Sequence, residues 1–307
     1  MDQFNVYKDM KARTNGEIYI GVVGPVRTGK STFIKRFMNL MVLPNIEDEN
    51  DRNRANDELP QSSSGKTIMT TEPKFVPNEA VSIKTEEGIE LNVRLIDCVG
   101  YMVEGATGHM EGEEERLVKT PWFDYEIPFT KAAAIGTKKV ITEHSTIGVV
   151  VTCDGSFGEI AAKQYEPAEE ETIKQLKALK KPFVVLLNTI HPYSESTKQL
   201  AAEKEEKYQT KVLPMNLEQM KKEDIYEIIK SVLMEFPISS IGFYVPRWTE
   251  MLKKDHPLKM ELLQMARDVI TEKTTMRDIY EEQEKEYEYI TGQKLESVAM
   301  DSGEVVI

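Results

Sequence analysis

A glycine-rich stretch near the start of the chain has the residue types that bind phosphate. Residues 24–31, GPVRTGKS, fit G-x-x-x-x-G-K-S and lie between an apolar β-rich run and a helical pattern. In that context successive N–H groups of the loop face the phosphates, and the following helix adds its positive N-terminal end. We expect Lys30 to reach the β and γ phosphates and Ser31 to offer its hydroxyl to Mg²⁺. The nucleotide-binding residues predicted here are Gly24, Arg27, Thr28, Gly29, Lys30, Ser31 and Thr32.

An aspartate at the end of another apolar run supplies the second half of such a site. The run 93–96 ends at Asp97, and an acidic residue in this place holds Mg²⁺ in phosphoryl-transfer enzymes. Residues 97–100, DCVG, have the form D-x-x-G, in which the N–H of the glycine, here Gly100, senses a γ phosphate. This pattern is weak alone, but it gains weight because it follows a phosphate loop and a hairpin.

Three threonines precede the point where the chain returns to the sheet. Thr70 and Thr71, with Thr67 behind them, lie where a switch threonine senses the γ phosphate and Mg²⁺ in related enzymes. The alternative interpretation is that they are β-prone residues at a strand edge. The predicted catalytic residues are Lys30, Thr70, Thr71 and Asp97, and the predicted Mg²⁺ ligands are Ser31, Asp97 and Thr70.

Strand-like and helix-like patterns alternate along most of the chain and would position these residues. This alternation predicts an α/β fold with a mainly parallel sheet covered on both faces. The stretches 43–71 and 98–128 are predicted to be long loops, and residues 85–88 are predicted to connect an antiparallel hairpin. The predicted strands are 17–23, 81–84, 89–98, 147–153, 183–188 and 212–215, and the predicted helices are 30–42, 130–144, 167–179, 194–208 and 223–235.

The order of these elements resembles that of the Ras-like (TRAFAC-class) P-loop NTPases. The resemblance covers about residues 17–236, so we expect residues 1–16 to be an N-terminal lead-in and 17–236 to be a P-loop NTPase domain. From residue 237 the pattern changes to one short strand and a helix-rich stretch, which predicts the start of an α+β domain. We expect this domain to be incomplete, because residues 295–307 have the pattern of a strand with nothing after it to pair against.

The residues that would read the base depart from the GTPase pattern. GTPases of this class end the fifth core strand in N-K-x-D, whereas this chain has Asn188-Thr189-Ile190-His191. Asn188 remains a predicted nucleotide contact, but the carboxylate that pairs with guanine is missing. We therefore expect ATP as the nucleotide, or weak base selectivity. Arg27 is expected either to touch phosphate or to form a surface salt bridge.

Composition excludes several other classes of protein. A formal charge of −13 disfavours a general nucleic-acid or membrane-surface binder, because the chain shows no compensating basic patch. Two cysteines and four scattered histidines supply neither a disulfide framework nor a zinc cluster. The apolar runs are far shorter than the ~20 residues of a membrane helix, and the N-terminus lacks the pattern of an export signal. We expect a soluble cytosolic protein that binds no nucleic acid.

The segments GVVGPVRTGKSTFIKRFM, VRLIDCVGY and PFVVLLNTIHPY closely resemble the stage IV sporulation protein A family of endospore-forming bacteria. The resemblance implies a GTPase relative that hydrolyses ATP with Mg²⁺, and it assigns the roles above to Lys30, Ser31, Asp97, Thr70 and Thr71. It also implies that residues 237–307 are part of a middle domain. Hydrolysis in this family is linked to self-assembly into a basement layer for the spore coat.

The same resemblance implies partners and a location. The partners would be other copies of the full-length protein, a small amphipathic membrane-anchoring peptide of the stage V sporulation protein M type, and other coat morphogenetic proteins. The location would be cytoplasmic, at the mother-cell face of the outer forespore membrane. The residues alone leave open a second interpretation, a GTP-dependent switch that recruits a partner in one nucleotide state, and a third, a structural protein with a vestigial site.

Overall fold

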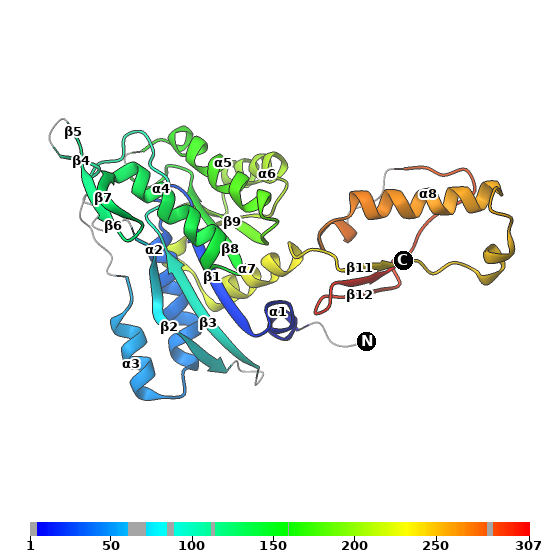
Figure 1. Ribbon diagram of the computed structural model, residues 1–307, viewed down its shortest axis with the longest axis horizontal. Helices are drawn as coiled ribbons and strands as arrows, with labels where there is room; N and C mark the ends of the chain where they lie inside the picture. The colour runs from blue at the N-terminus through cyan, green and yellow to red at the C-terminus, as the bar shows by residue number, and fades with distance from the viewer. Residues whose placement is uncertain (1–4, 61–71, 85–88, 112–113, 159, 281–284) are drawn as a thin grey trace. The chain divides into compact units, whose positions relative to one another are not determined.

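The computed structural model describes residues 5–60, 72–84, 89–111, 114–158, 160–280 and 285–307 (Figure 1). The chain forms two compact units. The large unit is Thr14–Val232, and the small unit combines Met1–Arg13 with Leu233–Ile307. Among the described helices, none is both long enough and apolar enough to cross a membrane.

A six-stranded sheet is the centre of the large unit (Figure 1). Its order is β10-β9-β8-β1-β3-β2, and all neighbours are parallel except β2 and β3, which pair antiparallel. Every residue of β8 and β9 is buried, as expected for central strands of a sheet covered on both faces. This confirms the predicted mainly parallel α/β fold. The strands are β1 (Glu17–Val23), β2 (Lys74–Lys84), β3 (Glu90–Asp97), β8 (Ile147–Cys153), β9 (Phe183–Asn188) and β10 (Val212–Met215).

Helices connect the parallel strands and cover the sheet (Figure 1). One core cluster joins Ile96 and Val150 of the sheet to Ile173, Leu176 and Tyr208 of the helices that follow β8 and β9. Two helices end in π-helical turns, at Met38–Val42 and Val140–His144. The helices of this unit are α2 (Lys30–Phe37), α3 (Glu49–Asp57), α4 (Phe129–Lys139), α5 (Ala162–Ala178) and α6 (Glu195–Tyr208), with α7 (Lys222–Met234) leaving it.

Both stretches that we predicted to be long loops contain regular structure, so those predictions were wrong. The first contains α3, which begins where the Asp48 side chain accepts a 2.9 Å hydrogen bond from the N–H of Asp51. Ala55 is the one buried residue of α3, and a helix so polar has no apolar period to detect. The second contains two hairpins, β4 (Met110–Glu111) with β5 (Glu114–Glu115) and β6 (Leu117–Thr120) with β7 (Phe123–Pro128).

Helix α5 begins at Ala162, five residues before its predicted start at Pro167. The structure caps the helix at Ala161, whose N–H donates to the Gln164 side chain over 3.0 Å. Pro167 is therefore inside the helix.

The small unit contains a three-stranded sheet and one long helix, α8 (Pro257–Glu272). Strand β13 (Glu304–Val306) lies between β11 (Ser240–Gly242), to which it is parallel, and β12 (Ser297–Ala299), to which it is antiparallel. Residues 295–307 were predicted to be one strand with nothing after it to pair against, but they form two strands, β12 and β13, which pair with each other. Strand β11 lies more than fifty residues earlier in the chain, and its pairing with β13 leaves no local pattern in the sequence.

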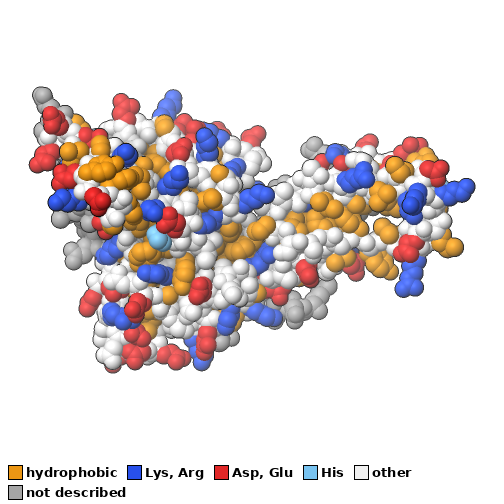
Figure 2. Space-filling view, in the orientation of Figure 1, with side chains coloured by type: hydrophobic (Ala, Val, Ile, Leu, Met, Phe, Trp, Pro, Cys, Tyr) orange, Lys and Arg blue, Asp and Glu red, His pale blue; other side chains and the backbone are white. Residues whose placement is uncertain are grey.

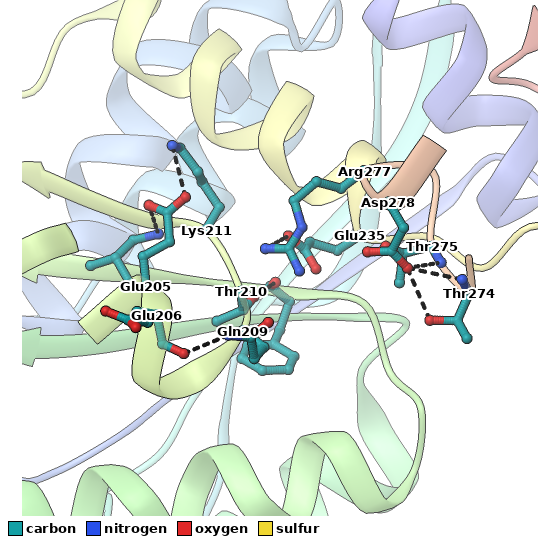
Figure 3. Close-up of polar contacts among 12 residues, drawn as sticks. Glu205, Glu206, Gln209, Thr210, Lys211, Glu235, Thr274, Thr275, Arg277 and Asp278 are labelled. Atoms are coloured by element: carbon teal, nitrogen blue, oxygen red, sulfur yellow. Dashed lines mark hydrogen bonds and ion pairs between the residues drawn. The ribbon is translucent and has the colours of Figure 1, made fainter. Parts of the chain in front are cut away.

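Helix α1 (Val6–Thr14) contributes to the small unit through Arg13. The guanidinium donates to the carbonyl of Pro237 over 2.8 Å and lies 5.3 Å from the centre of the Phe236 ring. Asp278 also stabilises this unit, because its carboxylate accepts hydrogen bonds from the N–H groups of Thr274 and Thr275 (Figure 3).

Large apolar side chains are exposed on the small unit (Figure 2). A cavity of about 420 Å³ lies between the segment after β11 and α8, and Tyr244, Trp248 and Leu262 are among its lining residues. The exposed apolar residues of this unit include Tyr244, Trp248, Met251, Met260, Leu263, Ile270, Tyr280 and Tyr289.

Candidate functional site

The glycine-rich loop joins the end of β1 to the start of α2, as its sequence predicts. Gly24 and Gly29 have φ angles of 125° and 100°, in a region that side chains with a Cβ rarely adopt. A Cβ on Gly24 would lie 2.5 Å from the carbonyl oxygen of Val151, and one on Gly29 would lie 2.5 Å from Nδ2 of Asn188. Both positions therefore need glycine to keep the loop against the neighbouring strands.

The Lys30 side chain is buried at the start of α2. Its ammonium donates to the carbonyl of Pro25 and approaches the carbonyl of Gly24 at 3.5 Å, so it lies over the loop. Burial lowers the pKa of Lys30, and the nearby Cys98 and Asp97 oppose that shift. An ammonium desolvated in this way gains strongly from an anion placed beside it.

Ser31 and Asp97 come together from α2 and the end of β3. The Ser31 hydroxyl donates to Oδ2 of Asp97 over 2.7 Å, and Oδ1 of Asp97 is buried with no hydrogen-bond partner among the described residues. Burial raises the pKa of Asp97, although the Ser31 hydrogen bond and the charge of Lys30 partly offset this effect. A hydroxyl and an unsatisfied carboxylate oxygen are hard oxygen ligands, so this pair fits Mg²⁺.

Backbone pairing holds the D-x-x-G segment against the phosphate loop. Val26 N–H donates to the carbonyl of Tyr101 over 2.9 Å, and Tyr101 N–H lies 3.3 Å from the carbonyl of Gly24. A Cβ on Gly100 would lie 2.1 Å from that same Gly24 oxygen and 2.7 Å from the Lys30 ammonium. Gly100 thus lies directly beside Lys30, as its predicted role near a γ phosphate requires. Burial raises the pKa of the adjacent Cys98 thiol to about 11, so this thiol stays protonated at neutral pH.

The remaining loop residues differ in what they contact. Arg27 is exposed, and its guanidinium donates to the carbonyl and hydroxyl oxygens of Thr107, at 3.2 and 2.9 Å. These two contacts are hydrogen bonds to uncharged oxygens, and whether Arg27 also touches phosphate stays a prediction. Thr28 is buried and its hydroxyl donates to the carbonyl of Pro25, whereas Thr32 is half-buried in the first turn of α2.

Asn188 links two segments beside the loop. Its Nδ2 donates to the carbonyl of Thr28 over 3.0 Å, and its Oδ1 accepts from the N–H of Leu217 over 3.2 Å. Leu217 begins the 3₁₀ helix η4 (Leu217–Gln219), which follows β10. The structure therefore places Asn188 in a bridging position between the phosphate loop and the turn after β10.

Sequence reasoning located Lys30, Ser31, Asp97, Gly100 and Asn188, which the structure brings to one edge of the sheet. Thr67, Thr70 and Thr71 lie outside the described residues. Three residues that contact the site were not among the predicted site residues. Leu217 and Tyr101 contact it through their backbone groups, and Thr107 accepts hydrogen bonds from the exposed Arg27. The parallel neighbours β9 and β10 offered one signal for Leu217, because the ends of adjacent parallel strands meet at one edge.

Two family descriptions match the chain and divide it between them. Residues 1–237 match "Stage IV sporulation protein A, ATPase domain", and residues 238–307 match "Stage IV sporulation protein A, middle domain".

Curated relatives carry the same name. Stage IV sporulation protein A of Bacillus anthracis is 47% identical over 99% of this chain, that of Clostridioides difficile 54% identical over 90%, and that of Bacillus subtilis 46% identical over 99%. The chain spans 62%, 56% and 62% of the lengths of these proteins, respectively.

Proposed function

Because this chain belongs to the stage IV sporulation protein A family and residues 1–237 are its ATPase domain, we propose that the chain hydrolyses ATP to ADP and phosphate with Mg²⁺. The observation that carries the proposal is the convergence of Lys30, Ser31 and Asp97 at one edge of the sheet. These are a buried cation, a hydroxyl and an unsatisfied carboxylate oxygen, on adjacent elements.

Each of these groups has a distinct part in the proposed reaction. The loop N–H groups and the N-terminus of α2 bind and orient the triphosphate. Lys30 leaves its carbonyl contacts and stabilises the negative charge that develops on the transferred phosphoryl group. In this proposal the N–H of Gly100, a residue that lies beside Lys30, senses whether a γ phosphate is present.

Ser31 and Asp97 would hold Mg²⁺, with Thr70 as a further proposed ligand from the segment outside the described residues. When bound, the ion neutralises charge on the β and γ phosphate oxygens. The ion would lie beside the buried Asp97 carboxylate, whose cost of burial Ser31 and Lys30 only partly offset, and this favours Mg²⁺ binding.

We further propose that hydrolysis drives self-assembly of the full-length protein into the basement layer of the spore coat. The assembly would form at the mother-cell face of the outer forespore membrane, with an amphipathic peptide anchor and other coat proteins as partners. The sporulation name of the relatives and the exposed apolar side chains of the small unit support this proposal.

The test is nucleotide turnover by the purified chain, followed as phosphate release with ATP and Mg²⁺. The expected result is turnover that stops when Mg²⁺ is chelated. Sedimentation of the full-length protein then compares ATP with a non-hydrolysable analogue, and polymer is expected with ATP alone. A strong preference for GTP, with nucleotide-dependent partner binding and no polymer, would favour a switch protein instead.

A further inference from the structure

The structure limits where the base of a nucleotide can lie. The Mg²⁺ candidates Ser31 and Asp97 lie on the β3 side of the phosphate loop, so the γ phosphate belongs on that side. The nucleoside must then extend in the other direction, along the carboxyl ends of β8, β9 and β10. On that side, a Cβ on Gly29 would lie 2.5 Å from Asn188 Nδ2 and 3.4 Å from Leu217 Cδ1. The turns after β9 and β10 are therefore the protein surfaces next to the loop.

The turn after β9 has used all three of its N–H groups within the protein. Thr189 N–H donates to the carbonyl of Met215 over 3.0 Å, and Ile190 N–H donates to the hydroxyl of Ser156 over 3.1 Å. His191 N–H donates to the hydroxyl of Thr189 over 3.1 Å. This turn therefore offers no unused backbone donor to a base.

In the turn after β10, the N–H groups of the three residues of η4 are likewise used within the protein. Leu217 N–H donates to Asn188 Oδ1 over 3.2 Å, Glu218 N–H to Asn216 Oδ1 over 3.0 Å, and Gln219 N–H to the carbonyl of Asn216 over 3.1 Å. Asn216 is thus responsible for two of the three contacts, as the cap of η4. The exposed carboxylate of Glu218, which can only accept hydrogen bonds when ionised, remains at this edge.

From this pattern we propose that the Asn216–Gln219 turn selects adenine by the substituent at position 6 of the purine, with Glu218 as the specificity-determining residue. Adenine carries an amine there, which donates to a carboxylate. Guanine carries an oxygen, which needs a donor and is repelled by a negative charge. The His191 imidazole can both donate and accept, so it does not discriminate by itself. This inference rests on the proposed function, because it assumes that the loop holds a nucleoside triphosphate.

The size of the effect follows from the kind of contact. A hydrogen bond to a charged group contributes enough to change an affinity ratio by about tenfold or more. Removing the charge of Glu218 should therefore reduce the preference for ATP over GTP by about tenfold, while leaving triphosphate binding by the loop in place.

The experiment measures competition of ATP, GTP and inosine triphosphate against a fluorescent non-hydrolysable ATP analogue, with Mg²⁺ present. Inosine triphosphate carries the oxygen of guanine at position 6 without its 2-amine, so it isolates the proposed contact. The variant Glu218→Gln replaces a pure acceptor with a group that also donates. Asn216→Ala frees the Glu218 N–H as a donor for the oxygen. Glu203→Gln, an exposed position on α6, is the matched control.

The wild-type chain is expected to reject inosine triphosphate as strongly as GTP. Both Glu218→Gln and Asn216→Ala should bind these two nucleotides better relative to ATP, and Glu203→Gln should behave as wild type. The proposal is overturned if wild type binds inosine triphosphate as tightly as ATP, or if Glu218→Gln leaves the ATP to GTP ratio unchanged. Base discrimination without any ATP turnover would overturn the proposed hydrolysis and leave this inference standing.

Discussion

Ser31 and Asp97 share one hydrogen bond of 2.7 Å, and the second carboxylate oxygen of Asp97 is buried without a hydrogen-bond partner in the described part of the chain. A carboxylate in this position is costly when ionised, because burial removes water from it. Protonation of Asp97 removes this free-energy cost, and a cation bound beside the carboxylate offsets it. Protons and Mg²⁺ should therefore compete for Asp97.

Replacing Asp97 with Asn should therefore have opposite effects on stability and activity. Mg²⁺-dependent hydrolysis should be lost, because the amide is a poor ligand for the ion. The metal-free protein should be at least as stable as wild type, because the cost of burying the Asp97 charge outweighs the attraction of Lys30 and is removed by the change. Phosphate release and thermal unfolding in chelator measure the two effects. A large loss of stability in Asp97→Asn would show that the carboxylate is structural.

The difference in stability between Asp97→Asn and wild type should also depend on pH. Burial raises the pKa of Asp97, so the charged form destabilises the folded wild-type protein at neutral pH. As the pH falls through this raised pKa toward the ordinary value of 3.8, the carboxyl group is protonated and wild type gains stability. The advantage of Asp97→Asn should shrink over that range in chelator, as measured by denaturant unfolding at a series of pH values.

Replacing Lys30 with Ala should abolish hydrolysis. The ammonium lies beside Gly100, and its loss removes the contact to the developing phosphate charge. We expect kcat to fall by about a hundredfold or more. Lys35→Ala, at a half-buried position of the same helix, is the control and should retain turnover. Unchanged turnover in Lys30→Ala would remove the catalytic assignment.

Breaking a buried ion pair between α5 and α6 should destabilise the large unit. Lys204 donates to Glu169 at 2.7 and 3.0 Å, and the Thr152 hydroxyl also donates to this fully buried carboxylate. Lys204→Met leaves the carboxylate unpaired and should cost about 3–5 kcal/mol in denaturant unfolding. Lys207→Met breaks the exposed pair with Glu170 and should cost less than about 1 kcal/mol. Equal effects of the two changes would contradict this account.

Asp278 should stabilise the small unit in a pH-dependent way. Burial alone would raise its pKa, but hydrogen bonds from Thr275 and Thr274 outweigh that effect and lower it. The contribution is therefore present above the ordinary pKa of 3.8 and is lost as the pH falls through the lowered value. Asp278→Ala should cost about 1–2 kcal/mol at neutral pH, measured by denaturant unfolding. The exposed Asp255→Ala should cost little, and a similar loss there would count against the role of Asp278.

Local signals in the sequence were sufficient for the phosphate loop and for most of the sheet, although β2 begins at Lys74 and not at the predicted residue 81. The apolar runs 147–153 and 183–188 correspond to β8 and β9, and the glycines at 24 and 29 occupy positions that require them. Helix α3 escaped prediction because its polar residues have no apolar period, and its stability depends on capping and on tertiary contacts.

The contacts of the candidate site were harder to predict, because many of them involve the backbone. Asn188 was identified because it ends a strand at the position of the GTPase N-K-x-D pattern. Its partner Leu217 contributes an N–H group, which every residue except proline possesses. Arg27 illustrates the same limit: its residue type suggested phosphate or a salt bridge, and no sequence pattern indicated that its guanidinium also donates to the oxygens of Thr107.

Helix α1 and the segment after α7 belong to one compact unit, although 219 residues of the large unit, Thr14–Val232, separate them in the chain. During synthesis from the N-terminus, Arg13 leaves the ribosome long before Pro237 and Phe236, with which it makes its contacts. The six-stranded sheet of the large unit can therefore form before Pro237 and Phe236, the residues that Arg13 of α1 contacts, have been synthesised. The small unit can form only after the large unit has been synthesised, and a shortened gene product beginning at residue 14 would leave it without Arg13.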